Sequence, residues 1–342
     1  MLISVIVPCY NLASWIRDCL NSVLGQSFSD WECVVVDDES TDDSPSILDG
    51  YANQDSRIRV IHQKNSGEGG ARNAGMSIAR GEWVFFLDGD DVMAPGALET
   101  LAKIISDYPS ENLIRFGYAN FEDGSAYPFV QQDKNVCKRI DISKQIAYDD
   151  YYVYVWQFLF RRTLIADMQF DNYKRGADRT FIVPVLCFKT NSFLTTDAVC
   201  YFYRQRMGSA VHSRPSVQVL KDELSHRVDI IEAIDSCGKL MPYAGTAWLE
   251  GYCLCGYLNC VEKFGGYNRE ERTELLKWFY RQLPRIQQAN GYSVVGRLYA
   301  FLHGVTKGKF GRYLIRWFIP LWTHRVKKMM SMILPSPSKK AA

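Results

Sequence analysis

A short apolar segment that ends abruptly in carboxylates constrains this chain more than any other feature. Trp83–Leu87 is a run of aromatic and branched residues, typical of a strand buried on both faces, and Asp88, Asp90 and Asp91 follow it directly. Buried carboxylates without partners are costly, so these side chains belong at the carboxyl end of the strand, where a cation can neutralise them. Their oxygens favour Mg2+ or Mn2+. The alternative is a solvated turn, because Asp and Gly are common turn residues.

Strands alternate with helices through the N-terminal part of the chain. The expected strands are Ile3–Val7, Trp31–Val36, Ile58–His62, Trp83–Leu87 and Leu113–Gly117. The expected helices begin at Leu12 and cover Ser46–Tyr51 and Ala71–Ala79, with Ser44 as the N-cap of the second. This alternation predicts an α/β fold in which a mainly parallel sheet lies between helices and ligands bind beyond the carboxyl ends of the strands.

Three chain segments should therefore meet at one edge of the sheet: Pro8–Asn11, Asp37–Ser40 and Asp88–Asp91. Their convergence favours a ligand site over a solvated turn. The flexible, glycine-rich loop Asn65–Gly70 lacks the Gly-x-Gly-x-x-Gly spacing and follows the third strand rather than the first. A dinucleotide-binding dehydrogenase is therefore disfavoured.

Cysteine usage and charge place further limits. The 10 cysteines are scattered, without a Cys-x-x-Cys pair, which favours reduced thiols in a cytosolic protein over a disulfide framework or a zinc site. The N-terminus has no basic region typical of a signal peptide. Thirteen basic residues and no acidic residue follow Glu274, so the tail carries +13 and the preceding residues −11. This asymmetry predicts that the tail meets an anionic surface.

Five sequence blocks together resemble family 2 glycosyltransferases. They are Val5–Asn11, Val34–Thr41, Asn65 with Gly67, Ala71–Gly75 and Phe86–Asp91. The resemblance is dense over about the first 115 residues and thinner to about residue 210. It implies a GT-A fold and an inverting enzyme that uses a nucleotide-diphosphate sugar.

The resemblance also implies roles for residues at the converging edge. Asp38 would accept a hydrogen bond from the nucleotide base, Pro8 and Tyr10 would line the base pocket, and Arg72 would lie near the base or the phosphates. Asp88 would lie near the ribose and the donor sugar. Asp90 would reach a metal on the diphosphate and Asp91 would extend the metal cluster, although the sequence does not say which acid ligates the metal directly. A solvent-exposed Arg72 is the alternative reading of that residue.

A second carboxylate is expected to act as the general base. In the family the corresponding loop usually reads Glu-Asp, and here Ala177 replaces the glutamate before Asp178. Asp178 is the predicted base, because inversion in one displacement needs a base within hydrogen-bond reach of the acceptor hydroxyl. The alternative is a surface aspartate in a salt bridge with Arg175 or Arg179.

A basic segment follows the last expected strand, which begins at Val199. In the family this segment can fold over the diphosphate, so the resemblance implies that Arg204, Arg206 and Ser209 are candidates to contact it. A positively charged loop with a glycine suits a lid on a pyrophosphate. The chain has no Gln-x-x-Arg-Trp block, the mark of the family's processive synthases. Transfer of a single sugar is therefore expected.

The C-terminal third has a helical pattern, and we predict domains at residues 1–215, the catalytic domain, and 216–342, a helical region. From Arg297 the chain mixes aromatic and basic residues, and no apolar run reaches the length of a spanning helix. A basic amphipathic tail in the membrane interface is predicted. A helical bundle that packs on the catalytic domain is the alternative, and no motif supports nucleic-acid binding.

The sequence thus predicts a metal-dependent inverting glycosyltransferase at the cytoplasmic face of the membrane. It would use Mn2+ or Mg2+ and transfer one sugar, from a UDP-sugar, to a lipid-linked or glycan acceptor in the assembly of bacterial surface polysaccharide. One alternative is a nucleotidyltransferase, although the usual glycine-rich, lysine-bearing N-terminal loop is absent. Another is a non-catalytic protein of the same fold that binds sugar nucleotides or glycans, which the missing glutamate at position 177 would suit.

Overall fold

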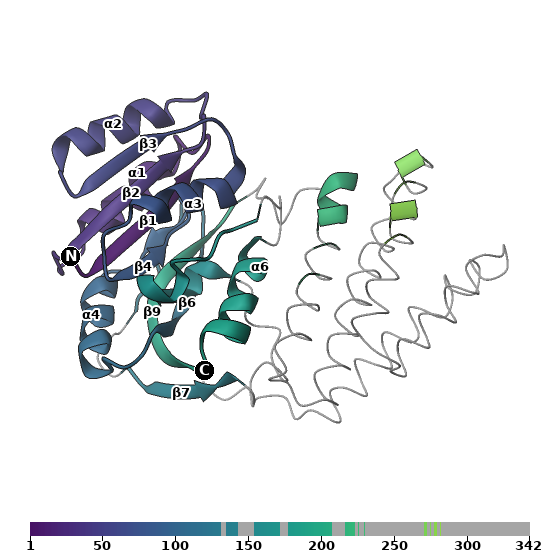
Figure 1. Cartoon of the computed structure of the whole chain (residues 1–342). Helices are drawn as coiled ribbons and strands as arrows, with labels where there is room; N and C mark the ends of the chain where they lie inside the picture. The colour runs from purple at the N-terminus through teal and green to yellow at the C-terminus, as the bar shows by residue number, and fades with distance from the viewer. Residues whose placement is uncertain are drawn as a thin grey trace. The chain divides into compact units, whose positions relative to one another are not determined.

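The computed structural model describes residues 1–130, 135–142, 154–171, 177–206 and 216–222, together with residues 225, 229, 270, 271, 274, 277, 278 and 281. The chain divides into two compact units, Met1–Gln145 with Asp150–Lys239 and Ile146–Asp149 with Leu240–Ala342. The strands of the described residues all belong to the first unit (Figure 1). The predicted boundary after residue 215 stays a prediction, and the predicted basic tail lies outside the described residues.

Nine strands form one sheet in the described part of the chain. They are β1 (Ile3–Cys9), β2 (Trp31–Asp37), β3 (Ile58–His62), β4 (Trp83–Phe86), β5 (Val92–Met93), β6 (Leu113–Glu122), β7 (Cys137–Asp141), β8 (Phe158–Arg161) and β9 (Ser192–Gln205). The order is β3-β2-β1-β4-β8-β6-β9-β5, and β7 pairs with β9. All six predicted strands are present, and the last, expected from Val199, already begins at Ser192 as β9.

The sheet has a parallel half and a mixed half. β3, β2, β1 and β4 are parallel, which confirms the arrangement predicted for the N-terminal part. β8 then runs antiparallel to both β4 and β6, while β6 and β9 are parallel to each other. The acidic segment after β4 therefore lies in the middle of the sheet, at the junction of the two halves.

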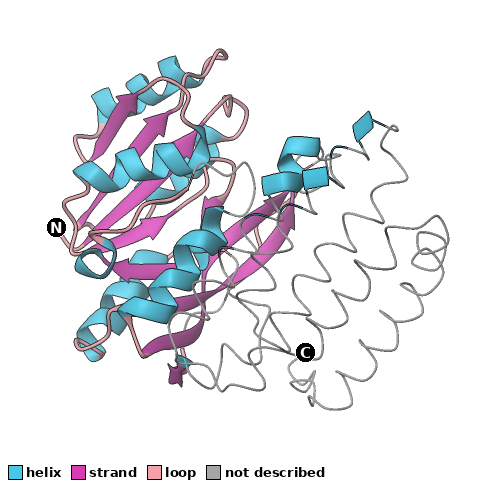
Figure 2. Cartoon of the chain, turned by 45° about the vertical axis from the view of Figure 1, so that its right-hand side comes forward, coloured by secondary structure: helices cyan, strands magenta, loops and turns pink. Residues whose placement is uncertain are grey.

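Helices flank the strands (Figure 2). They are α1 (Ile16–Leu24), α2 (Ser44–Gln54), α3 (Gly67–Ile78), α4 (Ala97–Asp107) and α6 (Ala177–Pro184), with the short helices η1 (Val155–Gln157), η2 (Arg162–Ile165) and η3 (Val185–Lys189). Within β2, Cys33 and Val35 pack in the cluster that includes α1, α2 and α4, whereas Val34 and Val36 pack with Ala71 of α3. Burial on both faces explains why this strand is apolar at successive positions. In the described chain, no helix combines the length and the apolar character needed to cross a bilayer.

The glycine-rich segment differs from its prediction as a flexible loop, because α3 already begins at Gly67. The carboxylate of Asp38 supplies the cap: Ser66 N–H donates to Oδ1 over 2.9 Å and Gly67 N–H to Oδ2 over 2.8 Å. A carboxylate at a helix N-terminus satisfies free N–H groups and opposes the helix dipole. Glycine is also required at position 69, where an added Cβ would lie 2.5 Å from the carbonyl oxygen of Asp171.

Ser44 has a different role from the predicted N-cap. The cap position of α2 is Asp43, and the Ser44 side chain is fully buried. Its Oγ accepts a hydrogen bond from the backbone N–H of Leu12 over 2.9 Å. Ser44 therefore ties the loop before α1 to the start of α2, a long-range contact that no local signal reveals.

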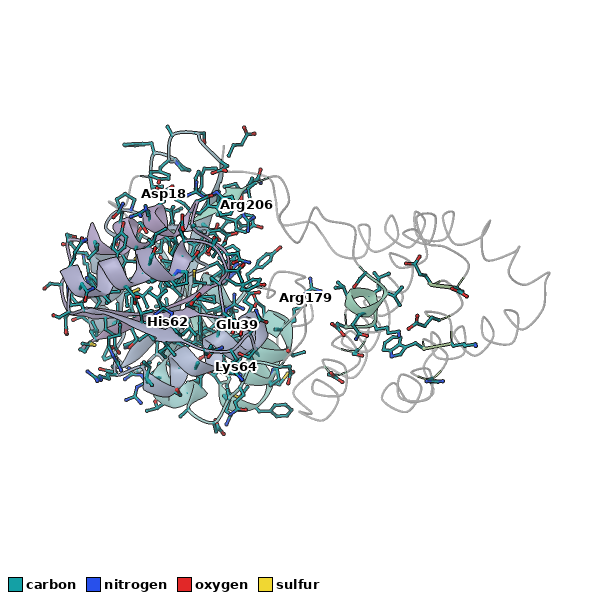
Figure 3. The ribbon with its side chains drawn as sticks, turned by 90° about the horizontal axis from the view of Figure 1, so that it is seen from above. Asp18, Glu39, His62, Lys64, Arg179 and Arg206 are labelled. Atoms are coloured by element: carbon teal, nitrogen blue, oxygen red, sulfur yellow. The ribbon has the colours of Figure 1, made fainter. Side chains whose placement is uncertain are left out.

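His62 joins β3 to its neighbours and gives a pH-dependent contribution to stability. Its Nδ1 lies 2.9 Å from Asp37 and its Nε2 lies 3.1 Å from Asp49 (Figure 3 labels His62). The hydrogen bond with Asp37, opposed by desolvation and assisted by Asp49, raises the pKa of His62 above its ordinary value of 6.5. Because the folded pKa is raised, this stabilisation is fully present below the unfolded pKa and disappears as the pH rises through the folded pKa.

We therefore expect His62→Gln to destabilise the protein at low pH more than at high pH. The measurement is urea unfolding of both proteins between pH 5.5 and pH 9, roughly the range in which a raised histidine pKa titrates. A difference in unfolding free energy that stays constant across this range would contradict the assignment.

Candidate active site

The carboxyl ends of β1, β2 and β4 meet at one edge of the sheet, as predicted. Asp38 donates its backbone N–H to the carbonyl oxygen of Cys9 over 2.8 Å. Gly89 lies so close to β1 that an added Cβ would be 2.8 Å from the carbonyl oxygen of Pro8. Because only glycine fits this approach, the acidic segment is held directly against the end of the first strand.

The residues predicted to contact a nucleotide base lie along this edge. Pro8 is buried in β1, and Tyr10, just after the strand, is 51% exposed. Asp38 is buried, and both of its carboxylate oxygens cap α3. The capping role is one that the sequence reading missed, and the contact of these three residues with a base stays a prediction.

Arg72 is the centre of the site. Its side chain is only 1% exposed, and its guanidinium group contacts three carboxylates from different parts of the chain. Nη2 lies 2.7 Å from Oδ1 of Asp88 and 2.6 Å from Oε1 of Glu68, and Nη1 lies 2.8 Å from Oδ1 of Asp178. A solvent-exposed Arg72 is thereby excluded. The guanidinium brings the predicted donor-site residue Asp88 and the predicted base Asp178 together.

Asp178 is held at both carboxylate oxygens in the first turn of α6. Oδ1 binds Arg72, and Oδ2 accepts the backbone N–H of Val155 over 3.0 Å. The salt bridge at Oδ1 is thus with Arg72, whereas the alternative reading named Arg175 or Arg179. Arg175 lies outside the described residues. With 18% of its side chain exposed, Asp178 keeps limited access to solvent. Its role as base stays a prediction.

The two acids predicted to bind metal have different environments. Asp91 is buried, and its carboxylate accepts hydrogen bonds from the Tyr201 hydroxyl over 2.5 Å and from Arg204 N–H over 2.7 Å. Asp90 is 26% exposed, and Arg206 contacts its Oδ2 at 2.6 Å. In the described residues no partner is found for Oδ1 of Asp90. The geometry thus favours Asp90 as the direct ligand, with Asp91 holding β9 in place.

Negative charge is in excess around Arg72. Burial, opposed by Arg72 and reinforced by Glu68 and Asp178, raises the pKa of Asp88 to about 7. Burial and the neighbouring aspartates also raise the pKa of Asp91 well above its ordinary value. A divalent cation next to these carboxylates would offset this repulsion.

The acidic edge fits a metal that is shared with a substrate. No group of three or more His, Cys, Asp or Glu residues is arranged to hold a metal ion within the described ranges. Mg2+, however, typically takes only one or two carboxylates when phosphate oxygens and water complete its coordination. Oδ1 of Asp90, which has no partner among the described residues, meets that requirement, so the residues suit an ion that arrives with a diphosphate.

Arg204 has a structural role, because it links three separate segments of the chain. Its side chain is 4% exposed, and it contacts Asp123 at 2.7 Å and Asp18 at 2.9 Å. Its Nε donates to the backbone carbonyl of Asp90 over 2.7 Å. These partners leave Arg204 little freedom to bind a diphosphate directly, so its predicted ligand contact becomes less favoured than that of Arg206.

Arg206 is the more accessible of the two arginines. Its side chain is 20% exposed, and the guanidinium carbon lies 4.3 Å from the centre of the Trp15 ring. Figure 3 shows Arg206 on the same side of the sheet as Asp18. Arg206 therefore lies beside the candidate metal ligand Asp90, where a cationic group can also meet a diphosphate. Ser209 lies outside the described residues.

Three contributors to the site were missed in the sequence. Glu68 lies four residues before Arg72, a helical spacing that would have been visible if the loop had been read as helix. Val155, through its N–H, and Tyr201, through its hydroxyl, have no local sequence signal. Only the pairing of distant strands brings them to the acidic edge.

Comparison with known proteins agrees with this geometry. The family model for glycosyl transferase family 2 matches residues 4–168. The uncharacterized glycosyltransferase EpsJ of Bacillus subtilis is 36% identical over 215 residues, covering 61% of this chain and 62% of EpsJ. The putative teichuronic acid biosynthesis glycosyltransferase TuaG of the same organism is 36% identical over 151 residues, covering 44% of this chain and 56% of TuaG. Each match thus spans less than two thirds of the relative's length.

A solved structure shows the same fold. The crystal structure of a fragment of S. aureus TarS in complex with UDP has a TM-score of 0.64 and 23% identity, over 84% of this chain and 81% of the TarS fragment. The predicted GT-A fold is confirmed by this likeness and by the sheet described above. The matched region contains β1–β4, Arg72 and the acidic segment. Residues 4–168 of this chain, which include most of the candidate site, therefore match glycosyl transferase family 2.

Proposed function

We propose that this chain is an inverting glycosyltransferase that transfers one sugar from a UDP-sugar to a glycan or lipid-linked acceptor in surface-polysaccharide assembly. The observation that carries the proposal is the shared guanidinium of Arg72, which holds the predicted donor-site residue Asp88 together with the predicted base Asp178. The UDP in the TarS complex supports a uridine nucleotide, and the name of TuaG supports a cell-surface polysaccharide.

The donor would lie across the carboxyl ends of the parallel strands. Its diphosphate would approach Asp90, and Arg206 would move from Asp90 to the phosphate oxygens. A Mn2+ or Mg2+ ion bound by Asp90 and the diphosphate would stabilise the charge on the leaving UDP. Asp88, fixed by Arg72, would meet hydroxyl groups of the ribose or of the donor sugar.

Asp178 would accept the proton of the acceptor hydroxyl as that oxygen attacks the anomeric carbon and the bond to the diphosphate breaks. Position 177 is an alanine here, so no glutamate beside Asp178 can orient its carboxylate. The contacts with Arg72 and with the Val155 N–H would fix that orientation instead. A single displacement of this kind inverts the anomeric configuration.

The experiment that tests this function is an assay for UDP release. The purified chain is incubated with UDP-glucose, UDP-galactose or UDP-N-acetylglucosamine and Mn2+, and the released nucleotide is identified. We expect slow UDP release with at least one donor, and its loss in Asp90→Asn but not in Asp107→Asn, an exposed control at the end of α4. Release of pyrophosphate instead would identify a nucleotidyltransferase, and no release from any donor would contradict the proposal.

The basic tail is proposed to hold the enzyme on the cytoplasmic face of an anionic membrane, where a lipid-linked acceptor would be presented. The support is that 10 of the 13 basic residues after Glu274 lie from Arg297 onward, together with aromatic residues. We expect a chain truncated after Gly296 to lose binding to vesicles that contain phosphatidylglycerol. Equal binding of the truncated and full-length chains would remove the membrane proposal.

A further inference from the structure

An aromatic stack beside the predicted base is not explained by donor binding. The Tyr154 ring stacks on Trp156 with centroids 4.9 Å apart and an interplanar angle of 18°. Trp156 in turn stacks on Tyr201 at 4.4 Å and on Tyr203 at 5.6 Å. Tyr118 closes the group with an edge contact to Trp156 at 5.0 Å. Five rings from three chain segments therefore form one cluster, which we call the aromatic platform.

The platform has a buried base and an open surface. Trp156 is 3% exposed, whereas Tyr154 is 42% exposed and Tyr118 is 39% exposed. A ring that is fixed by stacking and still open to solvent loses little conformational freedom when it binds a ligand. Tyr154 and Tyr118 therefore form a surface that is preorganised for binding a ligand.

The platform is tied to the reacting groups on two sides. Tyr154 is followed by Val155, whose N–H donates to Oδ2 of Asp178 over 3.0 Å. Tyr201, at the base of the platform, donates its hydroxyl to Asp91 and accepts the N–H of Asp88 over 3.2 Å. A ligand on Tyr154 would therefore lie next to the predicted base.

The aromatic platform and the predicted nucleotide site lie in different halves of the sheet. The predicted base pocket lies at the ends of β1 and β2, in the parallel half. The platform comes from β6, η1 and β9, in the mixed half beyond β4 (Figure 1 labels β4, β6 and β9). The acidic segment lies between the two halves. A donor that extends from the base pocket to the acidic segment would leave the half with the platform to the acceptor.

We propose that Tyr154, supported by Trp156 and flanked by Tyr118, binds a pyranose ring of the acceptor. This inference rests on the proposed glycosyl transfer and assigns the acceptor subsite. The C–H face of a pyranose carries a slight positive charge that matches the negative face of an aromatic ring, and the tyrosine hydroxyls can meet the sugar hydroxyls.

Charge favours a neutral sugar ring over an anionic group at this place. The five side chains of the platform are tyrosines and a tryptophan, none of which carries a formal charge at neutral pH. The platform therefore offers a phosphate or carboxylate no charged partner, whereas a pyranose needs none. The polar, tyrosine-rich surface also distinguishes the platform from an apolar groove for a lipid chain.

The test is saturation-transfer NMR on the full chain with UDP and Mg2+, using the methyl β-pyranosides of glucose and N-acetylglucosamine as probes. We expect ring C–H signals with the wild-type protein and with Tyr154→Phe, and an about tenfold weaker association with Tyr154→Ala, since stacking contributes on that scale. Tyr108→Ala removes a tyrosine of similar exposure, 37%, at the end of α4 and should bind like wild type.

Two outcomes overturn the inference: no saturation transfer with the wild-type protein, or equal transfer in Tyr154→Ala and Tyr108→Ala. Stabilisation by UDP is measured on the same samples. If UDP stabilises the protein but the pyranosides bind independently of Tyr154, the platform assignment alone fails. If UDP has no effect, the proposed function fails with it.

Discussion

Arg72→Met is expected to lower the free energy of unfolding by about 3 kcal/mol, at the lower end of what removing one partner of a buried ion pair costs. Arg72 is 1% exposed and is the shared partner of Glu68, Asp88 and Asp178. Without it, three carboxylates face one another around an apolar side chain. We expect UDP release to be lost as well, since Asp88 and Asp178 would no longer be held together. Urea unfolding measures the first effect.

Two further variants make this prediction specific. Lys189→Met breaks the more exposed ion pair with Asp167 and should cost much less, because solvent screens exposed ion pairs. Arg72→Lys keeps the charge but not the planar, forked geometry, so it should recover part of the stability and little of the activity. Equal destabilisation by Arg72→Met and Lys189→Met would show that the carboxylates do not depend on the guanidinium.

Asp178→Asn is expected to lower the rate of sugar transfer by about 100- to 10,000-fold, the contribution typical of a general base. Asparagine keeps the shape of the side chain and can still accept the Val155 N–H, so UDP binding should change little. The measurements are transfer to an acceptor found with the wild-type enzyme and calorimetric titration with UDP.

The matched control is Glu68→Gln, which changes the more exposed carboxylate on the same guanidinium. We expect it to lower transfer by less than about tenfold, because solvent screens exposed ion pairs. If Glu68→Gln slowed transfer as much as Asp178→Asn, Glu68 would be the stronger candidate for the base. Full activity of Asp178→Asn would also exclude Asp178.

The parallel half of the sheet could be predicted because its signals are local. The strands of that half have four to seven residues, most of them apolar, and β1, β2 and β4 are buried at every position. Polar residues follow each strand, so the edge at which they meet could be inferred from parallel topology alone. The resemblance then placed Asp38, Arg72 and Asp88 at that edge.

The remainder of the site depends on contacts that the sequence does not encode locally. Asp38 was expected to bind a nucleotide base, and its additional role as the cap of the next helix, through the N–H groups of Ser66 and Gly67, could not be predicted. Asp91 could not be distinguished from Asp90 until β9 brought Tyr201 against it. Position in the sequence predicted which residues meet at this edge of the sheet. Strand pairing decides which of them remain accessible to a ligand.

The most direct test of the central claim is a thermal-shift titration of the full chain with UDP and GDP, with and without Mn2+. A ligand that binds only the native state stabilises it by RT ln(1 + [L]/Kd), about 2.7 kcal/mol when its concentration is roughly 100 times the Kd. We expect UDP with Mn2+ to raise the melting temperature, and UDP alone, or UDP with Mn2+ in Asp90→Asn, to raise it less. No stabilisation by either nucleotide would contradict the account.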